Sequence, residues 1–279
     1  MNMQNMILNV TPSPQDSRDW IYNNFKEIPD ILDLRYDLHP IRNQGNQGTC
    51  YAQSAACMKE WQEKKDYGLN EYLSPQFFYN NRFNWYDENT KNDEGMFGRD
   101  VMKILKDIGI CTEEEYPYGL REKKNNIPKY CYTQASEHKI KGYAQIKSID
   151  SLKQSLNNNG PCLIAFPVYN YTNEMWIQKK NESFKGGHAM TIVGYLEDCF
   201  IIRNSWGVQW GDDGYCYYKF KDWGSHWEIW TTIDDESFPQ PKPEINSESS
   251  ESKSDSESTK PKPKPKPQPH VECPKCIIT

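Results

Sequence analysis

The chain has 279 residues, of which 33 are basic and 39 acidic, giving a net charge of −6 and a mean hydropathy of −0.92. The negative charge argues against nucleic acid as the main partner. Because no run of 18 apolar residues is present, no helix is expected to span a membrane. The low hydropathy favours disorder, whereas 9 Trp, 18 Tyr and 10 Phe favour a packed core. These opposing signals must come from different parts of the chain.

The aromatic residues divide the chain into three parts. None of them lies beyond residue 238, and the last 41 residues hold nine of the 18 prolines. We therefore predict a folded body over residues 30–238 and a disordered tail over residues 239–279, first rich in Ser and Glu and then in Lys and Pro. Residues 1–29 are polar and contain three prolines, so an extended lead-in is predicted there.

The predicted elements change in kind along the body. Thr49 can cap a helix that runs through Trp61 and stops at Gly68. A second helix is predicted over residues 99–108, closed by Gly109. Four short β-rich runs follow, at residues 163–166, 189–193, 200–202 and 215–218. Helices first and strands afterwards predict an α+β fold, in which a helical lobe packs against a β lobe.

Cys50 lies where a glycine-bearing loop meets the first predicted helix. The free N–H groups and the dipole at this end of a helix favour a thiolate. Six residues earlier, Gln44 carries an amide that can donate to a developing oxyanion. A cysteine at a helix start is also a common packing residue, so Cys50 by itself does not define a nucleophile.

Two further residues complete a chemical set with Cys50. His188 begins a β-rich run, where a structural histidine is common, and Asn204 begins a loop, where Asn is ordinary turn chemistry. Taken together the three have complementary roles, because a thiolate nucleophile needs an imidazole partner and that imidazole needs an acceptor to fix its tautomer.

The sequence around these residues resembles the papain-like cysteine proteases. Residues 43–50 read N-Q-G-N-Q-G-T-C, residues 187–189 read G-H-A, and residues 204–215 read N-S-W-G-V-Q-W-G-D-D-G-Y. His188 follows Cys50 by 138 residues and Asn204 follows it by 154, near the roughly 130–150 of that family. The resemblance covers about Ile28 to Ile233. It implies a two-lobed fold, a helical lobe plus an antiparallel β-barrel-like lobe, with the active site in the cleft between them.

The resemblance also implies roles for the matched residues. Cys50 corresponds to the nucleophile, His188 to the general base and then acid, and Asn204 to the residue that orients His188. Gln44 corresponds to the oxyanion donor, beside the backbone N–H of Cys50. Trp206 is expected to shield the hydrogen bond between Asn204 and His188 from water.

A substrate-binding segment follows from the same resemblance. We expect an extended peptide to pair with Gly95, where a glycine permits close backbone approach, and to run beside Gly187. Met96, Phe97 and Ala189 would line an apolar pocket for the second residue before the scissile bond. These three side chains fit ordinary core positions equally well.

Two departures from the secreted members favour an enzyme of the disulfide-poor, bacterial or viral type. Gln47 stands where secreted members have a disulfide-bonded cysteine, and residues 1–29 are too short for their long helical inhibitory prosegment. No secretory signal is visible at the start of the chain. We therefore expect reduced thiols and a cytoplasmic monomer, or a protein packaged in a virion if the source is a large virus. Residues 1–29 are hypothesised to strap onto the body near the cleft.

The last residues carry a separate signal. Cys276-Ile277-Ile278-Thr279 has the form of a prenylation box, and Cys273 could accept a second lipid, which together would tether the chain to a membrane. Thr is not a usual final residue of such a box. A plain tail and a zinc site with His270 are the alternatives, although the zinc site lacks a fourth local ligand.

The function predicted from the sequence is that of a cysteine-type peptidase, an endopeptidase acting on polypeptides through a thioester intermediate, without cofactor or metal. The alternative is a catalytically silent papain-like module that binds peptides. A transglutaminase or another acyl transferase shares the triad logic but not the Asn-Ser-Trp-Gly cluster.

Overall fold

The computed structural model of the chain describes residues 6–23, 27–82, 95–120 and 126–234. The chain divides into two units, Met1–Gln240 and Pro241–Thr279, so the lead-in and the body fall in one unit. The predicted tail, with Cys273 and Cys276, lies outside the described residues. In the described part, no helix has the length and apolar character needed to cross a membrane.

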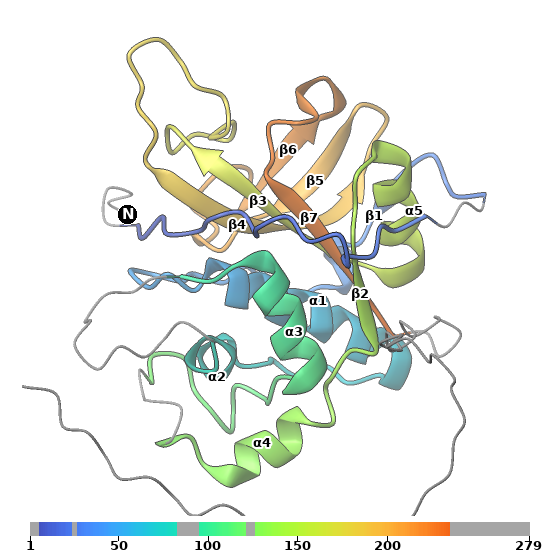
Figure 1. Cartoon of the computed structure of the whole chain (residues 1–279), viewed down its shortest axis with the longest axis vertical. Coiled ribbons are helices and arrows are strands. Elements are labelled where there is room, and N and C mark those ends of the chain that lie inside the picture. The colour runs from blue at the N-terminus through green and yellow to red at the C-terminus, as the bar shows by residue number, and fades with distance from the viewer. Residues whose placement is uncertain (1–5, 24–26, 83–94, 121–125, 235–279) are drawn as a thin grey trace, which may run out of the picture. The chain divides into compact units, whose positions relative to one another are not determined.

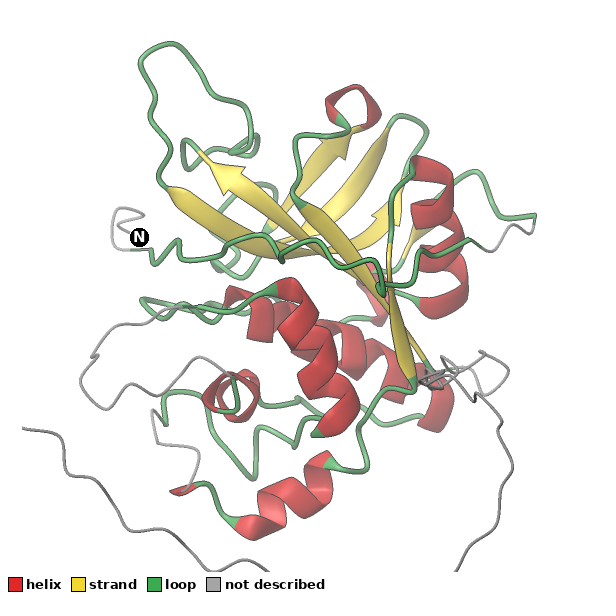
Figure 2. Ribbon diagram, in the orientation of Figure 1, coloured by secondary structure: helices red, strands yellow, loops and turns green. Residues whose placement is uncertain are grey.

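The first part of the body is helical and the second part is mostly strand, as Figure 2 shows. The helices are α1 (Cys50–Tyr67), α2 (Pro75–Asn80), α3 (Gly98–Asp107), α4 (Lys129–Ala135) and α5 (Ile149–Asn159). The strands are β1 (Leu32–Asp33), β2 (Gly142–Gln145), β3 (Cys162–Val168), β4 (Gly186–Tyr195), β5 (Cys199–Arg203), β6 (Tyr215–Lys219) and β7 (Glu228–Ile233). The predicted α+β class is therefore confirmed, and both predicted helices and all four predicted strands are present.

Helix α1 lies at the centre of the unit. Its residues from Cys50 to Glu63 are all buried, so it is covered on every side and has no single apolar stripe. Its buried charges are paired: Lys59 lies 2.9 Å from Glu63 in an ion pair, and Glu60 lies 2.6 Å from Arg42. The helix stops at Gly68, which takes the left-handed conformation at φ 71° that the predicted stop requires.

The strands form one antiparallel sheet in the order β2-β7-β3-β4-β5-β6, with β1 paired to β4. Alternate residues of β3 point to opposite faces, and both faces are buried. Leu163 and Ala165 join the core shared with α1 and α3, whereas Ile164 and Phe166 join the core of the sheet lobe together with α5. Helices α1 and α3 thus pack on one face of the sheet and α5 packs on the other (Figure 1).

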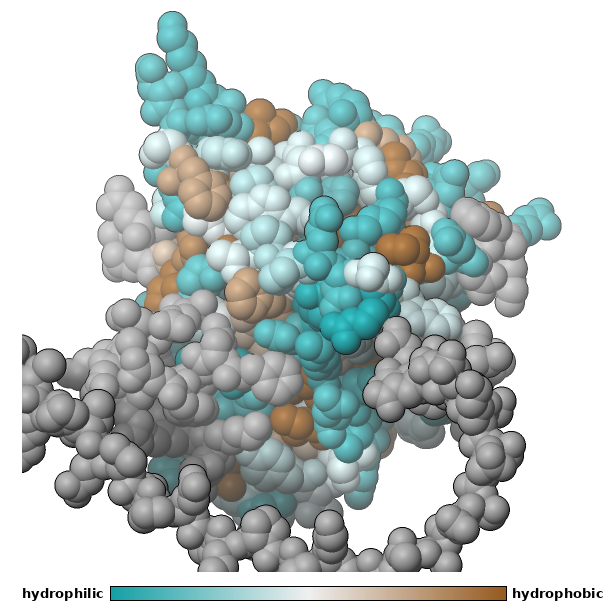
Figure 3. Space-filling model, in the orientation of Figure 1, coloured by the Kyte–Doolittle hydropathy of each residue, from teal (hydrophilic) through white to brown (hydrophobic). Residues whose placement is uncertain are grey.

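The face of the molecule seen in Figure 3 is largely hydrophilic, with hydrophobic residues in small separate patches.

Six further cysteines of the described body are buried and form no disulfide there, namely Cys57, Cys111, Cys131, Cys162, Cys199 and Cys216. Burial raises the pKa of these thiols, to about 12 for Cys162 and about 11 for Cys199. They therefore remain protonated, and unreactive as nucleophiles, at neutral pH.

Candidate active site

Cys50 is the first residue of α1 and is fully buried. The predicted side-chain cap by Thr49 is wrong, because its hydroxyl lies 2.7 Å from the Tyr118 hydroxyl instead and makes no cap bond. The Tyr118 hydroxyl in turn donates to the carbonyl of Gln44 at 2.9 Å. Tyr118 therefore ties both ends of the loop from Gln44 to Thr49 and fixes the entry into α1. No sequence pattern indicates this role of Tyr118.

His188 and Asn204 are joined by a hydrogen bond of 2.7 Å between His188 Nε2 and Asn204 Oδ1. His188 lies in β4, against which α1 packs, and Asn204 directly follows β5. The same Oδ1 accepts the backbone N–H of Ser205 at 2.8 Å, which identifies it as the amide oxygen. His188 Nε2 must therefore carry the proton, and Nδ1 is the unprotonated nitrogen of the neutral ring.

The environment keeps this imidazole neutral. Burial lowers the pKa of His188 to about 4, and the hydrogen bond to Asn204 offsets part of that effect. Among the described residues, Nδ1 has no hydrogen-bond partner. At neutral pH the ring thus presents a free lone pair, the state that a general base requires.

Trp206 covers this pair. Its ring stacks on the His188 ring with centroids 4.4 Å apart and planes 29° apart. Trp206 is itself almost completely buried, and Trp210 and Tyr171 meet its ring edge-on. Trp206 thus lies against the imidazole ring, the position that the expected shielding role requires.

Gln44 is held from three directions. Its backbone N–H donates to the Ser205 carbonyl at 2.8 Å, and its side-chain oxygen accepts from the Ser205 hydroxyl at 2.6 Å. Its amide nitrogen donates to the carbonyl of Gln47 at 2.9 Å. Because an amide nitrogen has two hydrogens, one donor remains for an oxyanion. Ser205, which follows Asn204 directly in the motif, is a positioning residue that the sequence analysis did not single out.

The residues predicted to bind substrate contact the N-terminal lead-in. We call residues 6–22 the strap; it runs between the sheet and α3 (Figure 1). The Val10 N–H donates to the Gly187 carbonyl at 3.3 Å, and the Gly187 N–H donates to the Leu8 carbonyl at 3.3 Å. On the other side, Thr11 pairs with Phe97 in a parallel bridge.

Gly95, the glycine predicted to permit close backbone approach, lies against the strap, and so does Gly187. A Cβ built on Gly95, whose φ is 70°, would lie 2.6 Å from the side-chain oxygen of Asn9. A Cβ on Gly187 would lie 2.1 Å from the Val10 carbonyl oxygen. Val10 is only 2% exposed and shares a hydrophobic cluster with Met96 and Ala189. Residues 6–22 thus contact the body beside Gly95 and Gly187, as expected if the lead-in straps onto it.

The strap is anchored beyond these residues by an ion pair. The Arg99 guanidinium, in the first turn of α3, donates to both carboxylate oxygens of Asp19 at 2.9 and 2.6 Å and also to the Pro14 carbonyl. The two charged side chains are only 11% and 8% exposed. The pairing with Asp19 raises the pKa of Arg99, so it stays charged. Nothing in the sequence linked these two residues, which lie 80 positions apart.

A second anchor is the buried carboxylate of Glu228, which sequence reasoning also missed. It accepts from the Tyr51 hydroxyl at 2.7 Å and from the Gly98 N–H at 3.2 Å, both in the helical lobe. It also accepts from the Trp230 indole at 2.9 Å and from the strap through the Ser13 N–H at 3.2 Å. Glu228 thus joins the helical lobe, the sheet and the strap.

Binding of a metal ion requires a group of ligating side chains that lie close together. Among the described residues, no group of three or more His, Cys, Asp and Glu side chains is arranged to hold a metal ion. The predicted lipid sites Cys273 and Cys276 and the alternative zinc ligand His270 lie outside the described residues.

Residues 28–229 match the family model of the papain family cysteine proteases, and the chain belongs to this family. Family membership supports a cysteine-type peptidase activity. The chain is 27% identical over 223 residues to an uncharacterised peptidase C1-like protein of Acanthamoeba polyphaga mimivirus, covering 69% of this chain and 71% of that protein. It is 29% identical over 225 residues to cathepsin K of Mus musculus, covering 75% of this chain and 65% of cathepsin K.

Solved structures agree with this assignment. Xylellain, a cysteine protease from Xylella fastidiosa, superposes with a TM-score of 0.72 at 27% identity, covering 82% of this chain and 96% of xylellain. The two-lobed papain-like fold predicted from the motifs is therefore the fold of this chain.

Proposed function

We propose that the chain is a cysteine endopeptidase that cleaves polypeptides with Cys50 as nucleophile. The observation that carries the proposal is the hydrogen bond of 2.7 Å between His188 and Asn204, which leaves Nδ1 of a neutral imidazole as the base. Cys50, at the start of α1, supplies the thiol.

The reaction proceeds by acyl transfer in two halves. His188 Nδ1 takes the thiol proton, and the Cys50 sulfur attacks the peptide carbonyl. The remaining amide hydrogen of Gln44 and the Cys50 backbone N–H bind the resulting oxyanion. His188 then gives its proton to the leaving amine, and a thioester forms. A water molecule, deprotonated by His188, attacks this thioester, releases the carboxylate product and restores the thiol.

The strap indicates how a polypeptide lies in the cleft. It binds as an extended chain through backbone hydrogen bonds to Gly187, the manner in which peptides add to an exposed backbone edge. Val10 buries a branched aliphatic side chain beside Met96 and Ala189. We infer that substrates place an apolar side chain in this position, and that the closed strap keeps them out.

Covalent labelling tests the function directly. We expect an epoxide inhibitor of cysteine proteases to modify the full chain at Cys50, located by peptide mass spectrometry, and a fluorogenic peptide with Val before the P1 residue to be cleaved slowly, because it has to displace the strap. Cys50→Ala should abolish both signals, while Cys57→Ala, a matched change at a buried thiol, should abolish neither. A catalytically silent peptide-binding module would bind the peptide without cleavage and without label on Cys50.

A further inference from the structure

A small cavity lies directly behind the catalytic asparagine. Its volume is about 10 Å³, and its lining includes Asn204, Gln53 from α1, and Arg42 from the loop that precedes Gln44. Gln53 is 5% exposed and Asn204 is 2% exposed, so both polar side chains are buried.

In the described part of the chain, each of these lining residues has one side-chain polar atom that is not satisfied by a hydrogen bond. Within the described residues, Asn204 Nδ2, Gln53 Oε1 and Arg42 Nε are buried and have no hydrogen-bond partner. The rest of the Arg42 guanidinium is engaged by Glu60, Glu113 and the Leu73 carbonyl. Unpartnered buried polar atoms are uncommon and costly, and here two donors and one acceptor belong to residues that line the same cavity.

We propose that one ordered water occupies this cavity and that Gln53 positions Asn204 through it. The volume matches a single water, for which about 10–15 Å³ suffices. The water accepts from Asn204 Nδ2 and Arg42 Nε and donates to Gln53 Oε1, which leaves one hydrogen for a lining hydroxyl of Ser54 or Thr191. Every unpartnered atom is then satisfied.

The orientation of Asn204 depends on this support. The last side-chain torsion of an asparagine is broad, so hydrogen bonds rather than rotamer preference set the plane of its amide. The oxygen end is held by Ser205 and by His188 itself. A water on the nitrogen end holds the other side, so that Oδ1 keeps facing His188 Nε2. Gln53 is thus a positioning residue for the triad, an inference that rests on the proposed function.

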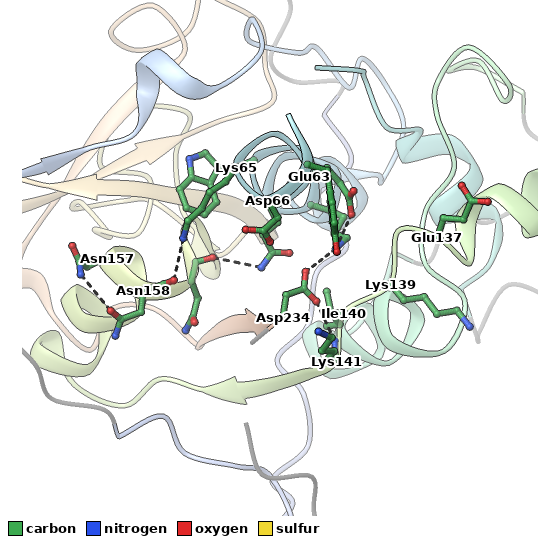
Figure 4. Close-up of a pocket in the computed structure, with 15 residues that line it drawn as sticks. Glu63, Lys65, Asp66, Glu137, Lys139, Ile140, Lys141, Asn157, Asn158 and Asp234 are labelled. Carbon is green, nitrogen blue, oxygen red and sulfur yellow. Dashed lines mark hydrogen bonds and ion pairs between the residues drawn. The ribbon is translucent and has the colours of Figure 1, made fainter. Parts of the chain in front are cut away.

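The matched control lies on the same helix. Gln62 is also buried and also has a side-chain oxygen without a hydrogen-bond partner among the described residues, but it lies nine residues, roughly 13 Å, further along α1. It lines a separate cavity of about 810 Å³ at the other end of the helix (Figure 4). That cavity is polar and is bordered by the ion pair of Lys59 with Asp234, remote from Cys50.

Crystallography of the full chain and kinetics of two variants test the proposal. We expect a density peak within hydrogen-bonding distance of Asn204 Nδ2 and Gln53 Oε1. We expect Gln53→Leu to lower kcat roughly tenfold, the lower end of the loss seen when the outer partner that orients a metal-ligating histidine is removed, which is a comparable orienting role. KM should stay within twofold, because no substrate contact changes. Gln62→Leu should keep the wild-type kcat.

Three results would overturn the proposal: no density peak in the cavity, an unchanged kcat in Gln53→Leu, or an equal loss in both variants. The density measurement needs neither turnover nor a folded variant. An inactive chain would therefore refute the proposed peptidase function, while the water site would still be decided by the wild-type crystal.

Discussion

Val10 and Gly187 pair through their backbones, with the Val10 N–H donating to the Gly187 carbonyl at 3.3 Å. Gly187 adjoins His188, so the chain holds its own extended segment beside the residues proposed to be catalytic. Two anchors away from the triad, Arg99 and Glu228, hold the same segment. We therefore expect binding of the strap and the proposed catalysis to depend on different side chains, which mutation can separate.

The first prediction concerns the ion-pair anchor. Asp19→Ala removes the carboxylate that Arg99 binds at two oxygens and should raise the initial peptidase rate about tenfold or more. A charge-assisted hydrogen bond contributes about 1.5–3 kcal/mol, and a change of that size shifts a two-state closure by about that factor or more. Initial rates on a fluorogenic peptide, normalised by epoxide titration of active sites, measure the effect.

The neighbouring carboxylate provides the control for the anchor. Asp16 binds Arg18, whose side chain is mostly exposed, so Asp16→Ala should leave the rate unchanged. If Asp19→Ala were no faster than Asp16→Ala, the strap would not limit access to the cleft.

The second prediction concerns the asparagine. Asn204→Ala removes the acceptor for His188 Nε2 and should lower kcat by about 100-fold, the lower end of what a positioned acid–base group contributes. KM should change little, because Asn204 faces the imidazole rather than the substrate. Asn170→Ala, at a mostly buried asparagine that bonds Glu182, is the matched control and should retain full kcat. Equal kcat values in the two variants would argue against an orienting role.

The third prediction ranks the losses of kcat in two variants at the proposed oxyanion donor. Gln44→Ala removes the donor and should lower kcat by about 10²–10³-fold. Ser205→Ala only releases the Gln44 side-chain oxygen, held at 2.6 Å, and should produce a smaller loss. Steady-state kinetics of both variants at one pH give the order. A larger loss in Ser205→Ala would mean that Ser205 acts on the reaction by another route.

The fourth prediction follows from the buried imidazole. The folded pKa of His188, about 4, lies below the ordinary 6.5, so between these values the unfolded chain binds the extra proton. The contribution of neutral, buried His188 to the free energy of unfolding is complete above pH 6.5. It is lost as the pH falls toward 4, and the total loss is about 3 kcal/mol. Urea unfolding of wild type and His188→Gln at several pH values measures this contribution as the difference between the two proteins.

His226, whose pKa burial also lowers to about 4, keeps its own dependence in both proteins of that comparison. The pH dependence should therefore be shallower in His188→Gln without disappearing. Parallel curves for the two proteins would show that His188 is not buried neutral in the folded chain.

Much of the fold was predictable because local signals agree with the final packing. The glycine stop at Gly68 and the β-rich runs of β3 to β6 are intrinsic to their segments. Strand β7 was missed because Glu228 and its threonines resemble a surface segment. That carboxylate is buried only because donors from α1, α3 and the strap converge on it, which no local pattern shows.

The candidate site was likewise predictable only in part. The positions of Cys50, His188, Asn204 and Gln44 followed from ordered motifs. Their supports did not: Tyr118, Arg99 and Gln53 act through partners that are distant in sequence or through a cavity between elements. The cap predicted for Thr49 failed for this reason, because Tyr118 competes for its hydroxyl.

The strap and the cleft belong to one polypeptide, so their association does not depend on protein concentration. Dilution leaves the cleft closed, whereas it would release a separate inhibitor. A tethered segment acts at an effective concentration on the order of millimolar, and a substrate has to outcompete it at that level. We expect short peptides with few contacts to lose this competition. Long chains that make more contacts along Gly95 and Gly187 should win it, so the tether would make substrate length a criterion of selection.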